Sequence, residues 1–200
     1  MHPSDSKLDE RDYEILHLMQ KDSRASFSKI AETLGVSHVT VGRRLERLIK
    51  AGYVKPTLVI NPVKFNFWLS ITLMEVESRD SIDEIVNQFK DCPRILSIMS
   101  TTGNYNVVLL TIAENRQTLE SIAGHCSPRT QAHVRHSETL LCMPLTENFL
   151  TVPLPDPSKD DECTCGLNCL DCPAFASKRC PGCPDKPYYR SQWQSAQKTP

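Results

Sequence analysis

The sequence predicts an α+β protein made of a helical domain, a βαββαβ domain and a short cysteine-rich tail. Three observations support this prediction. Residues 1–67 carry apolar residues at helical spacing around a glycine turn, and residues 68–150 alternate between strand-like and helical segments. Six cysteines then fall within Cys163–Cys183. Because helices and strands repeat their buried positions with different periods, these changes of pattern mark the domain boundaries.

The composition is that of an ordinary globular protein without a strong overall field. The chain has 200 residues, 40% hydrophobic and 24% charged, with a net charge of -1. With no global basic field, any affinity for nucleic acid has to come from a local patch. No apolar run approaches the roughly 20 residues that span a bilayer, and the polar N-terminus is unlike a signal peptide. We therefore expect a cytoplasmic protein with no membrane partner.

Two short amphipathic helices are predicted between Phe27 and Gly52. The first has apolar residues at positions i, i+3, i+4 and i+7, namely Phe27, Ile30, Ala31 and Leu34. Gly35 ends this helix, because glycine readily takes the left-handed conformation that closes a helix. Ser37 is the expected N-cap of the second helix. Two short helices joined by a glycine turn form a helix-turn-helix unit.

Two further elements complete the predicted helical domain. Asp9 is placed to cap an earlier helix whose apolar face continues toward Lys21. The segment Tyr53–Ile60 is rich in β-forming residues and Asn61-Pro62 marks a turn, so a short strand pair, or wing, is expected there. The sequence therefore predicts a winged helix-turn-helix domain over residues 1–67.

The outward face of the second helix is the predicted DNA-binding surface. It carries Ser37, His38, Thr40, Arg43, Arg44 and Arg47. Hydroxyl and guanidinium groups suit the base edges and phosphates of a major groove. Arg43 is the first choice for a guanine or phosphate contact. Arg44 suits equally an ion pair with an acid of the first helix, and His38 suits equally an exposed position without a DNA contact.

The second domain is predicted to have ferredoxin-like topology. Strand candidates are Leu69–Val76, Ile95–Ser100, Tyr105–Ile112 and Val134–Met143, and the helical stripes lie at Ile82–Phe89 and Leu119–Cys126. This β-α-β-β-α-β order is the ferredoxin-like split unit. Val107–Leu110 is apolar on both faces of its strand. A second sheet covering the face that the helices leave open would explain this pattern, which implies a dimer.

The C-terminal region is predicted to bind a metal through thiolates. A stiff, exposed proline-rich linker is expected over residues 151–162, a tail over residues 163–187, and disorder over residues 188–200. The candidate ligands are Cys163, Cys165, Cys169, Cys172, Cys180 and Cys183. Each CxxC turn directs two sulfurs toward one point. Tetrahedral zinc needs four thiolates, and an iron–sulfur cluster is equally satisfied by cysteines, so both cofactors stay open, as does a metal- or redox-responsive role.

The helical domain resembles the DNA-binding half of the Lrp/AsnC transcription regulators. The residues that carry the resemblance include Leu8-Asp9, Ile30-Ala31, Leu34-Gly35-Val36-Ser37, Arg44-Leu45 and Gly52. The βαββαβ segment looks like the small-ligand domain of that family, and the resemblance covers residues 8–147. It implies homodimers or higher homo-oligomers that bind double-stranded DNA operators and respond to an amino acid or a similar small metabolite.

The resemblance also implies an effector site at the central hairpin of the second domain. The corresponding residues are Gly103, Asn104, Tyr105 and Asn106. Many relatives end this turn in aspartate, whereas this chain has Asn106. A neutral amide attracts an ammonium group less strongly than a carboxylate does. A plain hairpin turn without a ligand is the alternative interpretation.

An enzyme of the same architecture is the alternative function. Siroheme decarboxylases resemble these regulators but bind a tetrapyrrole and release carbon dioxide. The groups available for acid–base chemistry are His125, His133, Arg135 and His136. The sequence has no glycine-rich phosphate loop and no nucleophile elbow, so no catalytic residue is assigned. The arginine-bearing helix face has no role in such an enzyme, so the sequence favours a transcription regulator.

Overall fold

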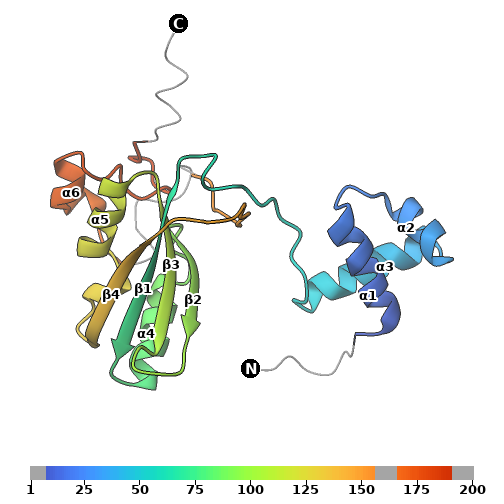
Figure 1. Ribbon diagram of the computed structural model, residues 1–200, viewed down its shortest axis with the longest axis horizontal. Coiled ribbons are helices and arrows are strands. Elements are labelled where there is room, and N and C mark those ends of the chain that lie inside the picture. Colours follow the sequence, from blue (N-terminus) through green and yellow to red (C-terminus); the bar gives the residue numbers. More distant parts are fainter. Residues whose placement is uncertain (1–7, 156–165, 191–200) are drawn as a thin grey trace, which may run out of the picture. The chain divides into compact units, whose positions relative to one another are not determined.

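The structure, a computed structural model, describes residues 8–155 and 166–190 (Figure 1). The chain forms two compact units, Met1–Leu58 and Val59–Pro200. The boundary therefore lies nearer the N-terminus than residue 67. Residues 59–67 belong to the second unit, where Ile60 and Leu150 exchange two backbone hydrogen bonds of 2.9 Å.

The first unit consists of the three predicted helices. They are α1 (Glu10–Lys21), α2 (Phe27–Leu34) and α3 (His38–Lys50). Each begins at a side chain that accepts a backbone N–H: Asp9, Ser26 and Ser37 respectively. Gly35 closes α2 with a φ of 66°, the left-handed conformation that glycine adopts without strain. The helices enclose a core of Ile15, Ile30, Ala31 and Val41.

The predicted wing is wrong. Residues 53–59 contain no strand, and Leu58 is 77% exposed, so this part of the described chain buries no apolar face. Pro56 lacks the N–H that a strand ladder requires. Ile60 pairs instead with Leu150 in the second unit. The β-forming residues here belong to a connection between units rather than to a hairpin.

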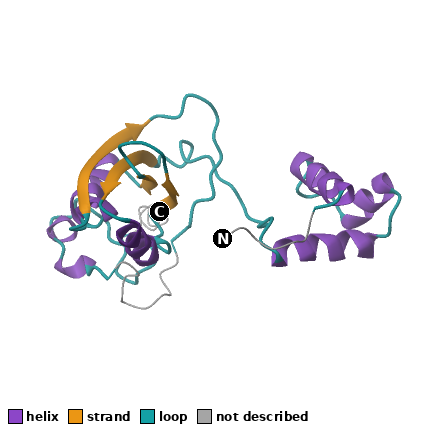
Figure 2. Cartoon of the chain, turned by 90° about the horizontal axis from the view of Figure 1, so that it is seen from below, coloured by secondary structure: helices purple, strands orange, loops and turns teal. Residues whose placement is uncertain are grey.

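The second unit has the predicted βαββαβ order. Its elements are β1 (Trp68–Val76), α4 (Arg79–Phe89), β2 (Ile95–Ser100), β3 (Val107–Ala113), α5 (Arg116–His125), the 3-10 turn η1 (Pro128–Thr130) and β4 (Val134–Cys142). The strands form one antiparallel sheet in the order β2-β3-β1-β4. Both long helices lie on one side of the strands (Figure 2). This arrangement confirms the ferredoxin-like prediction.

The two faces of the sheet differ in burial. On the helix-covered face, Met74 and Leu109 are fully buried against Phe89 of α4. On the opposite face, Val108 and Leu110 are only half-buried. Strand β3 therefore presents apolar side chains to both faces of the sheet, and those on the face without helices are less buried.

The C-terminal segment packs on the second unit instead of extending from it. It contains a 3-10 turn, η2 (Cys169–Asp171), and a short helix, α6 (Pro173–Ala176). Leu167 packs against the α4 core. The predicted exposed linker is wrong at its start, because Val152 is buried with Leu69 and Ile112; residues 156–162 lie outside the described residues. The predicted disorder is wrong for residues 188–190, since Tyr189 is 8% exposed; residues 191–200 lie outside the description.

No helix in the described ranges is both long enough and apolar enough to cross a bilayer.

Asn106 fastens the central hairpin to β1. Its Nδ2 donates to the Val76 carbonyl and its Oδ1 accepts from the Val76 N–H, both at 2.8 Å, while its own N–H donates to Met74 at 2.9 Å. We expect Asn106→Ala to lower the free energy of unfolding by about 1–3 kcal/mol, because it leaves part-buried backbone groups unpaired. Urea unfolding measures this change. Asn104→Ala, in the exposed part of the same turn, is the control, and equal stability of the two variants would contradict the assignment.

Candidate functional sites

Helix α3 is fixed at its N-terminus by a pair of hydroxyls. The Ser37 Oγ accepts from the Thr40 N–H at 3.1 Å, and the two hydroxyl oxygens lie 2.8 Å apart. The buried residues Val41, Leu45 and Leu48 hold the opposite side of the helix in the core. The polar face of α3 is thereby turned outward, as predicted.

Two arginines of that face are paired with carboxylates of α1 and its cap. Arg44 Nη1 lies 2.6 Å from Asp9 Oδ2 and 2.9 Å from Asp12 Oδ1, and Arg47 Nη2 lies 2.5 Å from Asp12 Oδ2. Asp12 is fully buried. The ion pair that was one of the two expectations for Arg44 is thus present, and Arg47 is tied to the same carboxylate of Asp12.

These pairs lower the pKa of both acids. For Asp9, the hydrogen bond from Arg44 is the main cause. For Asp12, burial raises the pKa, but hydrogen bonds from Arg47, the Asp9 N–H and Arg44 outweigh it. The two carboxylates therefore remain charged, and their ion pairs hold Arg44 and Arg47 in place.

Arg43 differs from its two neighbours. Its side chain is exposed and makes no ion pair with any residue that the structure describes. It borders a shallow hollow together with Thr40 and the paired Arg44 and Arg47. His38, at the start of the helix, is also exposed. The geometry leaves Arg43 as the arginine of this face with an uncommitted charge.

The predicted effector residues form an exposed hairpin turn. Gly103 has a φ of 127°, and the Thr101 hydroxyl donates to the Tyr105 carbonyl at 2.5 Å. Gly103 and Asn104 are exposed. The amide of Asn106 is occupied by Val76, so it serves the fold.

Tyr105 contacts His136 and Glu138; the sequence offered Tyr105 and His136 for different roles and did not bring them together. Its ring stacks on His136 with a centroid distance of 5.9 Å, and its hydroxyl lies 3.5 Å from Glu138. Burial, Glu138 and Glu75 raise the pKa of the tyrosine. Strand pairing places Glu75 opposite His136. His136 and Glu138 are two residues apart on β4, so they lie on the same face of the strand. This spacing is the sequence signal from which the group was predictable.

The acid–base groups offered for an enzyme are engaged in local contacts. His133 lies 3.6 Å from Glu84, and Arg135 lies 3.5 Å from Glu77. His125 contacts the carbonyl of Ser121 within its own helix at 3.0 Å. His136 stacks on Tyr105. His133 and Arg135 share Glu77, at 3.8 and 3.5 Å, whereas His125 and His136 each make a contact of their own.

The structure describes four of the six cysteines in the tail. These are Cys169, Cys172, Cys180 and Cys183, whereas Cys163 and Cys165 lie outside the described residues. Within the described ranges, no three His, Cys, Asp or Glu side chains are arranged so that they hold a metal ion. Burial raises the pKa of both Cys126 and Cys180, and Cys126 also feels Cys180, Cys92 and Cys169. Thiols of the ferredoxin-like domain thus lie near those of the tail, a proximity that sequence spacing does not reveal.

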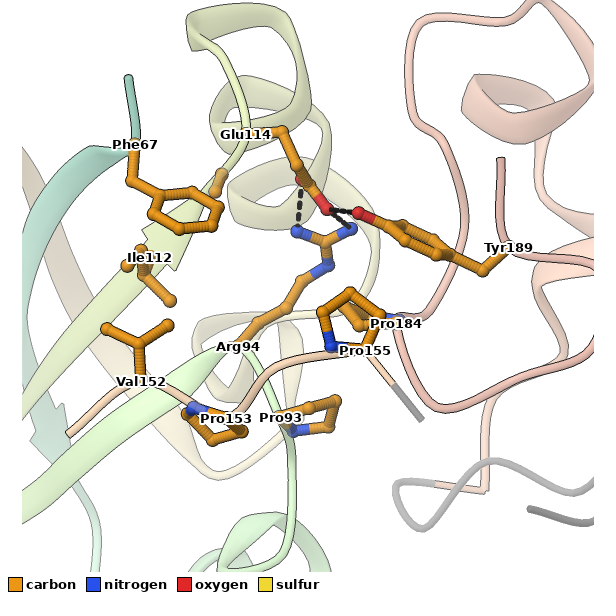
Figure 3. A pocket seen from close by; sticks show the side chains of 11 residues that line it. Phe67, Pro93, Arg94, Ile112, Glu114, Val152, Pro153, Pro155, Pro184 and Tyr189 are labelled. Carbon is orange, nitrogen blue, oxygen red and sulfur yellow. Dashed lines mark hydrogen bonds and ion pairs between the residues drawn. The ribbon is translucent and has the colours of Figure 1, made fainter. Parts of the chain in front are cut away.

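A buried ion pair holds the C-terminal segment. Arg94 Nη1 lies 2.6 Å from Glu114 Oε2, and Arg94 Nη2 lies 3.0 Å from Glu114 Oε1. The segment supplies two more partners: the Gly182 carbonyl accepts from Arg94 at 2.6 Å, and the Tyr189 hydroxyl donates to Glu114. Figure 3 shows Glu114 between the arginine and the tyrosine. Arg94 and Glu114 are 5% and 9% exposed, so the ion pair is shielded from solvent.

The cavity beside this pair is small. It has a volume of about 20 Å³ and is lined by Phe67, Ile112, Val152 and Pro184 as well as by the ion pair. A single water needs roughly 10–15 Å³ of such volume. The cavity therefore accommodates one water and excludes a metabolite.

A helix-turn-helix unit joined to a ferredoxin-like domain defines a class of transcription regulators, and the comparisons identify which one. A family model for AsnC-type helix-turn-helix domains matches residues 8–49. An HTH-type transcriptional regulator of Methanocaldococcus jannaschii is 30% identical over 113 residues, covering 56% of this chain and 76% of that protein. LrpA of Pyrococcus horikoshii is 29% identical over 120 residues, covering 59% of this chain and 84% of that protein.

Solved structures share the fold. AsnC of E. coli has a TM-score of 0.59 at 18% identity, covering 69% of this chain and 93% of that one. A Neisseria meningitidis regulator solved as an L-Met complex has a TM-score of 0.60 at 18% identity, covering 74% and 97%. The chain belongs to the Lrp/AsnC family of transcription regulators. The relatives' names favour a regulator over the decarboxylase alternative.

The Arg94–Glu114 pair predicts a pH-dependent stability. Burial raises the pKa of Glu114, but the charge and hydrogen bonds of Arg94, with that of Tyr189, outweigh it and leave the pKa below its ordinary value of 4.5. A carboxyl with a lowered folded pKa stabilises the fold above its unfolded pKa and loses this contribution as the pH falls through the folded pKa. We expect Glu114→Gln to lower the free energy of unfolding by about 3–5 kcal/mol at neutral pH, because Arg94 loses its countercharge.

Urea unfolding as a function of pH measures this effect. The difference between the wild type and Glu114→Gln should shrink as the pH falls below 4.5. Glu120→Gln is the matched control on α5, since Glu120 forms an exposed pair with Arg116 at 2.8 Å and such pairs contribute only about 0–1 kcal/mol. A difference for Glu114→Gln that stays constant with pH would refute the assignment.

Proposed function

We propose that this regulator binds operator DNA through the exposed face of α3. The observation that carries the proposal is the exposed position of Arg43 on α3, a helix that begins at the Ser37–Thr40 cap. A guanidinium at this position on a recognition helix suits guanine or a phosphate, and the hydroxyls at the helix N-terminus suit phosphate oxygens. The net charge of -1 provides no general attraction to DNA, so this local face has to supply it.

The three arginines have different parts in this proposal. Arg43 makes the direct contact. Arg47 shares the buried Asp12 with Arg44, so its role is to hold α3 on α1 while its exposed edge faces the groove. The Asp9 side chain, which is 52% exposed, competes with DNA phosphates for Arg44. The contribution of Arg44 to DNA affinity is therefore smaller than its place on the helix suggests.

We also propose that the active form is a homodimer or a higher homo-oligomer. The open face of the sheet presents half-buried Ile71 and Leu73 on β1 and Val108 and Leu110 on β3. Leu140, paired with Ile71, is 44% exposed. A second copy of this face would remove these side chains from water, and a dimer presents two recognition helices to a pseudo-palindromic operator.

The proposed effector is a small metabolite, an amino acid or a similar compound, bound near residues 103–106. The complex of a structural relative with L-Met supports this class of ligand. In this chain the polar groups beside the hairpin are Tyr105, His136 and Glu138. Asn106 is neutral and its amide is already bonded to Val76. The negative charge that would attract an ammonium group therefore comes from Glu138, which lies beside Tyr105.

Arg43 provides the test of the DNA-binding proposal. We expect Arg43→Ala to weaken operator binding by about 1–3 kcal/mol without unfolding the helical unit, because the side chain is exposed and supports no internal pair. A gel-shift titration at fixed salt measures the affinity. Arg11→Ala is the matched control, since it removes the same charge from an exposed pair on α1. Equal affinities of the two variants would remove Arg43 from the interface.

For the tail we propose a thiolate site for zinc, with an iron–sulfur cluster as the alternative. Two CxxC pairs, Cys169–Cys172 and Cys180–Cys183, support this proposal. We expect the anaerobically purified protein to contain bound metal, with broad visible absorption only for an iron–sulfur cluster. Replacing both Cys169 and Cys172 with serine should abolish metal binding, whereas Cys142→Ser, in β4, should preserve it. A wild-type protein without metal would contradict the proposal.

A further inference from the structure

The cysteine segment, residues 166–190, is attached to the same place as the connector, residues 59–67. The connector begins the second unit and follows the helical unit in the sequence. Its Phe67 lines one side of the small cavity, and Tyr189 of the cysteine segment lines another side (Figure 3). Both segments therefore pack around one small volume at the end of the sheet.

The packing on the connector side is apolar and continuous with the cavity. Val152 is buried with Leu69 and Ile112, and Ile60 and Phe67 pack against this cluster. Ile60 is also held by its backbone pairing with Leu150. Ile112 and Val152 line the cavity as well, so the connector's anchor and the ion pair that holds the cysteine segment border the same small cavity.

The bond to Arg94 comes from a tightly built turn. Gly182 lies between Cys180 and Cys183, with a φ of 97°, and a Cβ at this position would approach the Phe175 ring to 3.0 Å. The same ring receives Arg190, whose guanidinium carbon lies 3.8 Å from the ring centroid. Because this turn has so little freedom, a displacement at either cysteine moves the Gly182 carbonyl away from Arg94.

We propose that the cysteine segment acts as a clasp on the connector, so that ligands or modifications at its thiols change how firmly the connector is anchored. The buried Arg94–Glu114 pair makes the clasp cooperative, because opening it removes two hydrogen bonds from charged groups in one step. The coupling is reciprocal: whatever loosens the connector also weakens the binding of a ligand that requires the closed clasp. The proposal concerns the second unit alone and does not depend on DNA binding.

Tyr189→Phe tests the proposal in the full-length protein. This variant removes only the hydroxyl that donates to Glu114. We expect the Cys180 thiol to react about tenfold faster with N-ethylmaleimide and the Ile60 amide to exchange its hydrogen about tenfold faster, as local opening becomes more frequent. Tyr105→Phe is the matched control, because it removes a carboxylate contact at the opposite end of β3 and should change neither rate.

Exchange at Leu109, a fully buried residue of β3, distinguishes local from global opening. The proposal requires faster exchange at Ile60 with unchanged protection at Leu109. Faster alkylation of Cys180 with unchanged exchange at Ile60 would show that the segment docks without reaching the connector, and would overturn the proposal. Unchanged rates at both residues, or equal acceleration at Leu109, would overturn it as well.

Discussion

Each unit of this protein depends on a buried charge that has to be paired. In the helical unit the charge is the carboxylate of Asp12, and in the second unit it is the guanidinium of Arg94. A buried ion that loses its partner destabilises a fold by several kcal/mol, whereas the intact pair contributes little net stability. Such pairs therefore act less as a source of stability than as a constraint on geometry. They fix which segments pack together and in what register.

In the helical unit, the ion pairs of Asp12 position α3 on α1 and leave Arg43 outside these pairs. The apolar core alone would allow α3 to rotate or slide slightly on α1, because aliphatic contacts have little directional preference. The two guanidinium groups on Asp12 remove that freedom, since hydrogen bonds to a carboxylate are directional and short. Arg43 is then carried on a rigid helix. A contact residue on a preorganised surface loses less conformational entropy on binding.

The features that the sequence predicted correctly are local ones. Helix caps such as Ser37 and turns such as Gly35 depend on residues within one helical turn, so spacing is enough to place them. The order of strands and helices follows from the hydrophobic period for the same reason. The wing at Tyr53–Ile60 was mispredicted because strand propensity reports a half-buried environment, not a partner. Ile60 does pair, but with Leu150, which lies far along the chain.

The candidate sites were predictable only where they rest on one element. The outward face of α3 rests on one helix and was predicted. The attachment of Arg47 to Asp12 requires two helices in contact and was not predicted. Cys126 looked like an isolated residue of a helical stripe. Its neighbours in space come from the tail, which no periodicity reports.

The position of the cysteine segment has a consequence for how such a tail influences a regulator. A tail on a flexible linker affects its domain only through local concentration, whereas this one shares a buried ion pair with the sheet. In the proposed clasp, chemistry at its thiols therefore has a route into the packing of the second unit. That route ends at Phe67 and the connector, and the connector leads along the chain to the helices that carry Arg43. Through the proposed clasp, the chemical state of the tail therefore acts on the anchoring of the connector within the second unit.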